Sequence, residues 1–224
     1  MRPRSASDKE YFAQDWFIRR IEALRLPLVQ QGRNSYPDFW VGEGDNREGY
    51  EIKSLAFADG RPARRDLDFN STIPSGRKQG HEVFLVFFLY TGKGSAARRV
   101  HSVSIAHADL INADHALADA HLNVAIHNFG SYADGFIRNR KMYVFPHPIA
   151  LDPTGVSRIR LIVPATWRLR DRRLRQVGRI VRVVAPDAVS GYTIQVRDQG
   201  RPAIETIPHP GAGTEVAFEV FEPS

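Results

Sequence analysis

Residues 83–90 are eight consecutive apolar residues, and they constrain the fold of this chain more than any other segment. The run is far shorter than the roughly 20 residues that a membrane-spanning helix needs. A strand that is buried on both faces has a continuous apolar sequence of this kind. The run therefore predicts a central strand in a sheet that is covered on both sides.

Segments on either side of this run predict the rest of the fold. Apolar residues at helical spacing predict a helix within residues 7–25, which Ser7 or Asp8 caps and Pro27 ends. An alanine-rich segment predicts a second helix at residues 112–127. Segments of β-forming residues predict strands at 38–41, 49–57, 100–106, 142–145, 158–163, 177–184, 192–197 and 215–221. This order predicts an α/β fold with a mixed central sheet.

Two regions stand apart from this regular pattern. Residues 58–80 are polar, carry many arginines and show no clear period, so they predict a long loop. Long loops inside compact domains are uncommon and often functional. From residue 177 onward, short β-rich segments alternate with Gly and Pro. They predict either a small β subdomain or an extension of the main sheet.

The composition limits the chemistry. The chain has no cysteine, which excludes disulfides, thiolate zinc sites and a cysteine nucleophile, and which fits a reducing cytoplasm. No apolar stretch follows the two N-terminal arginines, so we expect no signal peptide, no membrane association and a cytoplasmic location.

The charge balance leans toward nucleic acid. The net charge is +6, and 26 of the 31 basic residues are arginine. Arginine forms bidentate contacts with phosphates and guanine edges. A genomic preference for GC-rich codons would also raise the arginine content, so both explanations remain open.

The most informative pattern combines Asp38 with Glu51 and Lys53. Twelve residues separate the two acids, and the Gly-Glu-Gly-Asp-Asn stretch between them is typical of a turn. Side chains alternate along a strand, so Glu51 and Lys53 share one face. A β-hairpin then brings Asp38 beside Glu51.

These three groups suit phosphodiester hydrolysis. Two carboxylates can hold Mg²⁺ and leave positions open for water and phosphate. A lysine beside them can orient the attacking water or stabilise charge on the phosphate. We therefore predict that Asp38, Glu51 and Lys53 are catalytic and that the cofactor is Mg²⁺. The alternative is an exposed hairpin with an incidental Glu–Lys ion pair.

The pattern Pro37-Asp38, twelve residues, then Glu51-Ile52-Lys53 resembles the PD-(D/E)XK nuclease superfamily, which includes most type II restriction endonucleases. The resemblance covers roughly residues 7–145. It implies an α/β core whose mixed central sheet is flanked by helices, as in restriction endonucleases. It also implies a further metal contact from an acid on the preceding helix, for which Glu22 is preferred over Glu10 because Glu22 is nearer the helix end.

The resemblance suggests a division of the chain. We expect a nuclease core at 1–165, with a DNA-contacting loop at 58–80, and a basic segment with the β-rich C-terminal part at 166–224. Within that loop, polar and cationic side chains predict DNA contacts at Asn70, Ser71, Thr72, Ser75, Arg77 and Lys78. A solvated loop is the alternative.

A second set of DNA contacts is predicted in the basic segment, at Arg168, Arg170, Arg172 and Arg173. These residues either follow a DNA backbone or form a solvated surface. The histidines at 107, 115, 121 and 127 match neither a zinc cluster nor a His-Asn-His nuclease site, and they predict ordinary positions on a helix surface.

The resulting hypothesis is a Mg²⁺-dependent, sequence-specific endonuclease that cuts double-stranded DNA. Because both strands of a symmetric site are cut, we expect a homodimer with two active sites. One rival is a structure-specific or repair nuclease of the same superfamily. Another is a DNA-binding module without catalysis.

Overall fold

The computed structural model describes the chain apart from residues 9, 33–34, 59–60, 63–65, 70–75, 111–122, 126–135, 139–142, 147–158, 184–191, 199–200 and 208–212. Within the described residues there is one α-helix, α1 (Tyr11–Ala23), with two short 3-10 helices, η1 (Gly44–Asn46) and η2 (Ala108–Leu110). The strands are β1 (Leu28–Gln30), β2 (Phe39–Val41), β3 (Glu48–Ala58), β4 (Arg61–Pro62), β5 (Asp66–Phe69), β6 (Arg77–Lys78), β7 (His81–Thr91), β8 (Arg99–His107), β9 (Asn123–Ala125), β10 (Phe136–Arg138), β11 (Tyr143–Pro146), β12 (Ile159–Pro164), β13 (Leu174–Val183), β14 (Tyr192–Asp198), β15 (Arg201–Ile207) and β16 (Glu215–Pro223).

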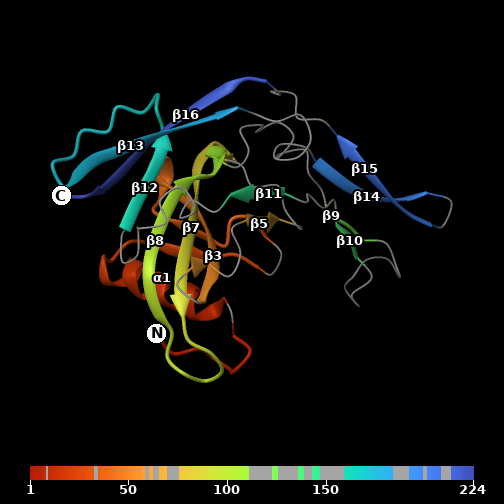
Figure 1. The fold of residues 1–224 in the computed structure, drawn as a ribbon, viewed down its shortest axis with the longest axis horizontal. Coiled ribbons are helices and arrows are strands. Elements are labelled where there is room, and N and C mark those ends of the chain that lie inside the picture. Colours follow the sequence, from red (N-terminus) through yellow and green to blue (C-terminus); the bar gives the residue numbers. More distant parts are fainter. Residues whose placement is uncertain are drawn as a thin grey trace.

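A large mixed sheet dominates the structure, which is a mixed α/β fold with few helices (Figure 1). Its main path runs β1-β2-β3-β7-β8-β12-β16-β13, and β4 and β6 pair at the side with β3 and β7. The pairs β3–β7 and β8–β12 are parallel, whereas the other pairs along the path are antiparallel. The prediction of a mixed sheet is confirmed.

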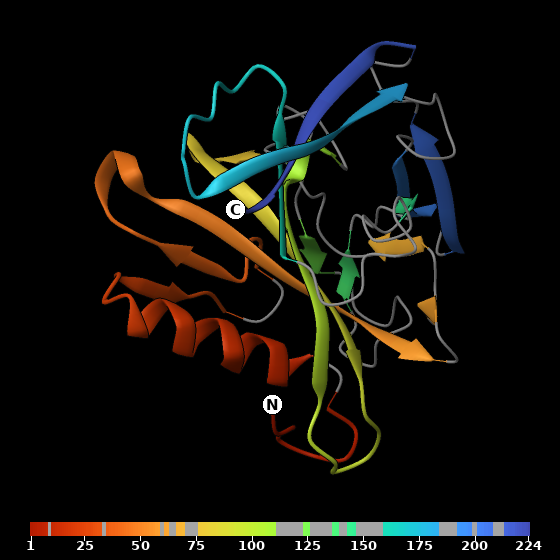
Figure 2. The ribbon, with the colours of Figure 1, turned by 60° about the vertical axis from the view of Figure 1, so that its left-hand side comes forward.

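Strand β7 is the buried central strand that its apolar run predicts. Its side chains alternate between two cores. Leu85 and Phe87 belong to one core, with Phe218 of β16. Val86 and Phe88 belong to the other, which contains Phe12 and other residues of α1. Figure 2 shows α1 lying beside the β1–β3 end of the sheet.

Helix α1 is shorter than the predicted segment. It begins at Tyr11, because Asp8 Oδ1 accepts the backbone N–H groups of Glu10 and Tyr11 at 3.0 and 2.8 Å. It ends at Ala23, and Arg25 then adopts a left-handed conformation with φ of 56°. The N-cap position is Glu10, so neither Ser7 nor Asp8 occupies it, although Asp8 accepts these two hydrogen bonds just before the helix.

Two predictions of local structure are wrong in part. Residues 58–80 do not form one continuous loop, because β4, β5 and β6 pair with β3, β11 and β7. The predicted helix at 112–127 includes residues 123–125, which form strand β9 and pair with β10. The rest of that helix lies outside the described residues. Only β5 has a partner distant in sequence, β11, whereas β4, β6 and β9 pair with neighbouring strands but are only two or three residues long, too short to show a pattern of their own.

The C-terminal strands divide into two groups. Strands β13 and β16 extend the main sheet beyond β12. Strands β14 and β15 form a two-stranded sheet, and β15 was not predicted. No helix in the described part of the chain is both long and apolar enough to cross a bilayer.

Candidate active site

The β2–β3 hairpin brings the two predicted carboxylates together. Phe39 pairs with Tyr50, which sets Asp38 beside Glu51. The backbone N–H of Asp38 donates a hydrogen bond to Glu51 Oε2 at 3.1 Å, and the backbone N–H of Ile52 donates one to Asp38 Oδ2 at 2.8 Å. The Glu51 carboxylate is thus held by the amide of the residue just before β2, and the Asp38 carboxylate by an amide of β3.

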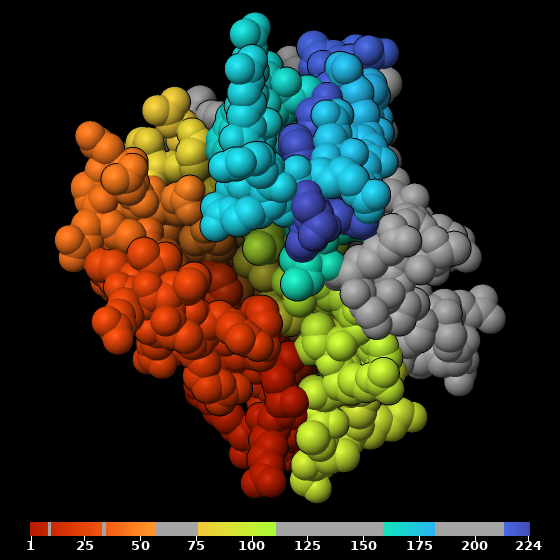
Figure 3. Space-filling view, turned by 90° about the vertical axis from the view of Figure 1, so that its left-hand side faces the viewer, coloured from red at the N-terminus to blue at the C-terminus, as the bar shows by residue number. Residues whose placement is uncertain are grey.

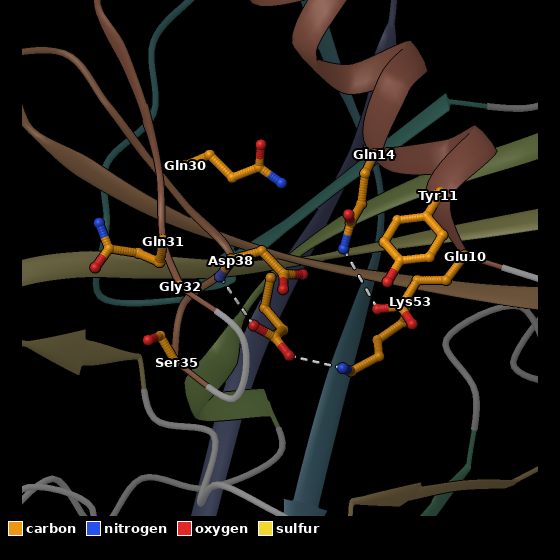
Figure 4. A pocket seen from close by; sticks show the side chains of 10 residues that line it. Glu10, Tyr11, Gln14, Gln30, Gln31, Gly32, Ser35, Asp38 and Lys53 are labelled. Atoms are coloured by element: carbon orange, nitrogen blue, oxygen red, sulfur yellow. Dashed lines mark hydrogen bonds and ion pairs between the residues drawn. The ribbon is translucent and has the colours of Figure 1, made fainter. Parts of the chain in front are cut away.

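Lys53 completes the group through strand alternation. Its Nζ donates to Glu51 Oε1 at 2.6 Å, and Figure 4 shows it directed toward the carboxylates. Ile52, between Glu51 and Lys53, points to the opposite face and is fully buried in the core that α1 covers. The arrangement expected from the two-residue period is therefore present.

The electrostatics of the group are unusual because like charges lie close together in a partly buried place. Burial and the charge of Glu51 raise the pKa of Asp38 to about 7, although the charge of Lys53 and the Ile52 amide act in the opposite direction. For Lys53, burial alone would lower the pKa, but the charges of Glu51 and Asp38 outweigh burial and raise it. Lys53 therefore stays an ammonium group at neutral pH.

A polar cleft of about 480 Å³ surrounds these side chains. It lies where the start of α1 meets β1, β2 and β3 (Figure 4). Its lining combines carboxylates, amides, hydroxyls and the lysine: Glu10, Tyr11, Gln14, Gln30, Gln31, Gly32, Ser35, Asp38, Glu51 and Lys53.

The acid that lines the cleft at the N-terminus of α1 is Glu10, the residue just before Tyr11. Its charge acts on both Asp38 and Lys53, and Gln14 Nε2 contacts its Oε1 at 3.4 Å. Glu22 is exposed and does not line the cleft. The two acids are twelve positions apart, which is about 18 Å along a helix. The preference for Glu22, which rested on its position nearer the helix end, is wrong, because the first turn of α1 is the part that meets the cleft.

Residues that the sequence did not single out also shape the cleft. Gln30 pairs with Phe39, and the backbone N–H of Gln31 donates to the Asp38 carbonyl at 2.8 Å, so β1 borders the site. Gly49 lets Pro37 approach closely, because a Cβ there would lie 2.7 Å from Pro37 Cγ. The sequence signal for Gly49 was its place two residues before Glu51 in the strand.

The predicted DNA-contacting loop is only partly described. Asn70, Ser71, Thr72 and Ser75 lie outside the described residues. Arg77 and Lys78 form β6, where they pair with Glu82 and His81, and neither residue lines the cleft.

The histidine prediction needs a correction at His107. This residue belongs to β8 and is 2% exposed, with its ring Nε2 2.7 Å from Glu82 Oε2. The prediction of a helix surface is therefore wrong for His107, which occupies a strand position facing the core. The other three histidines lie outside the described residues.

The donors present fit a small, hard cation. No group of three or more His, Cys, Asp or Glu side chains within the described residues is arranged to hold a metal ion. Mg²⁺, however, needs only one or two protein carboxylates, together with water and substrate phosphates. Asp38 Oδ1 accepts no hydrogen bond from any described residue, so this oxygen of the Asp38 carboxylate is available to bind a cation.

Comparison with known proteins adds no assignment, since no family model and no curated protein matches the chain.

Proposed function

We propose that this protein is a Mg²⁺-dependent endonuclease that hydrolyses phosphodiester bonds of double-stranded DNA at specific sequences. One observation carries the proposal. The Glu51 carboxylate accepts hydrogen bonds from the Asp38 amide and the Lys53 ammonium group, and the Asp38 carboxylate accepts one from the Ile52 amide. Two carboxyl groups and one ammonium group therefore converge in the cleft. Phosphoryl transfer needs little more from a protein than such positioning and charge.

Asp38 and Glu51 would hold the cation, and Glu10 would face it from α1. Bound there, Mg²⁺ supplies a Lewis acid at a phosphoryl oxygen and makes water more acidic. Asp38 must lose its proton before it binds the cation, because its pKa is raised to about 7. Activity should therefore increase with pH up to the slightly alkaline range.

Lys53 has a separate role. Its ammonium group lies 2.6 Å from Glu51, within reach of an attacking water or a phosphate oxygen in the same cleft. It can orient the water and balance the charge that builds on the phosphate in the transition state. A neutral side chain at this position would do neither.

The choice of DNA and of a restriction-type activity rests on support of a different kind. The hairpin carrying Asp38 and Glu51 lies in a mixed sheet, with α1 packed beside it, as the resemblance to PD-(D/E)XK nucleases implies. The net charge of +6 favours a polyanion. Cleavage of both strands of a symmetric site would require a homodimer.

The test is digestion of plasmid DNA with Mg²⁺ by the parent protein and by Asp38→Asn, Glu51→Gln and Lys53→Met variants. Each variant should lose about a thousandfold or more of the cleavage rate and retain its circular dichroism spectrum. Glu22→Gln is the matched control, because it removes a carboxylate outside the cleft. Cleavage that persists in EDTA, or in Glu51→Gln, would refute the proposal.

The products separate the rival functions. Discrete fragments with uniform ends indicate a sequence-specific enzyme. Cutting only at branches, flaps or damaged positions indicates a structure-specific or repair nuclease with the same site. Binding without any cutting by the parent protein indicates a DNA-binding module.

A further inference from the structure

The connection from β12 to β13 has a regular alternation of side chains. In residues 167–175, here called the arginine segment, Trp167, Leu169 and Leu174 are partly buried and pack on a core that contains Phe84. The intervening arginines are exposed: Arg168, Arg170, Arg172, Arg173 and Arg175. The apolar side chains therefore fix the segment to the sheet, and the guanidinium groups point to solvent.

Most of these guanidinium groups are not used by the fold. Arg173 forms an ion pair with Asp171 at 2.7 Å. Among the described residues, Arg168, Arg170, Arg172 and Arg175 make no side-chain hydrogen bond or ion pair. The acids nearby are engaged elsewhere, since Glu222 pairs with Arg160 and Glu219 contacts Gln176 and Arg179. Four cations thus remain unneutralised along one short stretch.

The arginine segment covers the face of the sheet opposite to the catalytic side chains. Its Trp167 ring lies 6.1 Å from the ring of Phe84, which stacks on Tyr50 at 5.6 Å. Tyr50 and Glu51 are neighbours on β3, so they point to opposite faces. Figure 3 shows the cyan segment on the same side of the molecule as α1, whose Phe17 also contacts Tyr50.

The segment continues into a strand far from the cleft. Strand β13 ends the sheet, five strand spacings from β3, which corresponds to about 24 Å. That distance equals roughly seven base pairs of duplex along its axis. Of the four arginines, Arg175 belongs to this strand, whereas Arg168 and Arg170 lie nearer to β7, on the face of the sheet opposite to Lys53.

We propose that Arg168, Arg170, Arg172 and Arg175 form a docking surface for the phosphate backbone of duplex DNA, outside the segment being cut and independent of metal. The choice of partner rests on the proposed function. The cleft carries three carboxylates and one ammonium group, so without metal it repels phosphate. The arginine segment has the opposite sign and supplies the binding energy that the cleft lacks.

Two other occupants fit this surface less well. Edge pairing of β13 with a second copy would bring arginines of both chains together, and like charges across strands are destabilising. A membrane surface needs apolar side chains between the cations. Here Leu169 and Leu174 face the core instead.

The test measures binding of a fluorescent duplex of about 40 base pairs in EDTA, over a range of salt concentrations. The double variant Arg170→Gln/Arg172→Gln should reduce the salt slope by about 2 and weaken binding alike for all sequences. The control Lys93→Gln/Arg99→Gln removes the same charge from two exposed residues flanking the β7–β8 turn, which lies far from β13 in Figure 1. It should leave the slope nearly unchanged.

An unchanged slope in the arginine variant, or an equal decrease in the control, would overturn the docking surface. Because binding is measured without metal, this result is separate from the proposed function. A parent protein that binds through these arginines but cuts nothing refutes the nuclease alone. If the parent protein cuts DNA and the Arg170→Gln/Arg172→Gln variant binds the duplex as well as the parent does, the docking surface alone is refuted.

Discussion

The cleft and the arginine segment both concentrate charge of one sign, but they hold it in different ways. In the cleft, Asp38 and Glu51 are tied by backbone amides and Glu51 by Lys53. In the arginine segment, four guanidinium groups extend into solvent without partners among the described residues. The first arrangement fixes each atom, whereas the second presents only a density of charge. Single substitutions should therefore be severe in the cleft and mild in the segment.

The largest expected effect tests whether the severity of a substitution depends on the burial of the charged group or on the region of the molecule in which it lies. Arg160 of β12 is an arginine near the segment, but it is 6% exposed, and its Nε lies 3.2 Å from Glu222 Oε1. Glu222→Ala should lower the free energy of unfolding by about 3–5 kcal/mol, because it leaves a buried cation without this partner. Urea denaturation measures the change.

The apolar double variant Arg160→Met/Glu222→Leu is the control for that prediction, since it removes both charges and should recover most of the loss. If Glu222→Ala proves harmless, then charges in this region are tolerant even when they are buried, and the comparison with the cleft fails.

The next largest effect concerns the acid on α1. Glu10→Gln should slow DNA cleavage about 10- to 100-fold, because it removes a charge that faces Asp38 and Lys53 without touching the main pair. Rates under single-turnover conditions provide the measurement. Glu22→Gln, on the same helix, should cut at the parent rate, and equal losses in both variants would remove Glu10 from the site.

A smaller effect is the pH dependence of stability. The pKa of Asp38 is raised to about 7 in the folded protein, above about 4 in the unfolded chain. Its contribution to stability is therefore present at low pH and is lost as the pH rises through 7. Without metal, Asp38→Asn should be more stable than the parent by about 1–2 kcal/mol at pH 8 and nearly equal at pH 4.

Denaturation at both pH values, with and without Mg²⁺, measures this difference. Mg²⁺ at pH 8 should stabilise the parent and not the variant, which closes the gap. A gain of the same size at pH 4 would show that the ionisation of Asp38 is not its cause.

The smallest effect is expected where charge alone matters. Arg170→Lys/Arg172→Lys keeps both cations and should hold DNA affinity in EDTA within about threefold, with the salt slope unchanged. Fluorescence anisotropy on the duplex described above is sufficient. A loss as large as that of the glutamine variant would mean that the arginines make directed, bidentate contacts, and the segment would then be as geometrically exacting as the cleft.

The catalytic trio was predictable because its geometry is local. Alternation along one strand places Glu51 and Lys53 together, and a single hairpin adds Asp38. The choice of Glu10 over Glu22 was not predictable, since helical periodicity gives the buried face of α1 but not which end of the helix meets the cleft. Gln30 was not predicted for a similar reason, because it reaches the cleft through the pairing of β1 with β2.

The same distinction explains the fold. The central strand β7 was evident from its own composition, and β8 and β12 from theirs. Strands β5, β6 and β9 exist through pairing with β11, β7 and β10, and for β5 that partner is more than 70 residues away. The pairing of β5 is decided by tertiary context, which outweighs the weak preferences of a short polar segment. Strands β6 and β9 pair with the next strand in the chain, but at two and three residues they are too short to show a pattern of their own.

The two backbone hydrogen bonds between Asp38 and the Glu51–Ile52 stretch have a consequence for how sites of this kind can diverge. They join the strands at the carboxylates themselves, so the turn around η1 is not needed to hold the acids in place. Lengthening a flexible loop costs only about 0.6 kcal/mol for each doubling. Insertions in this turn should leave Asp38 and Glu51 where they are. The twelve-residue spacing that first indicated the site is therefore the feature of the site that can vary most easily.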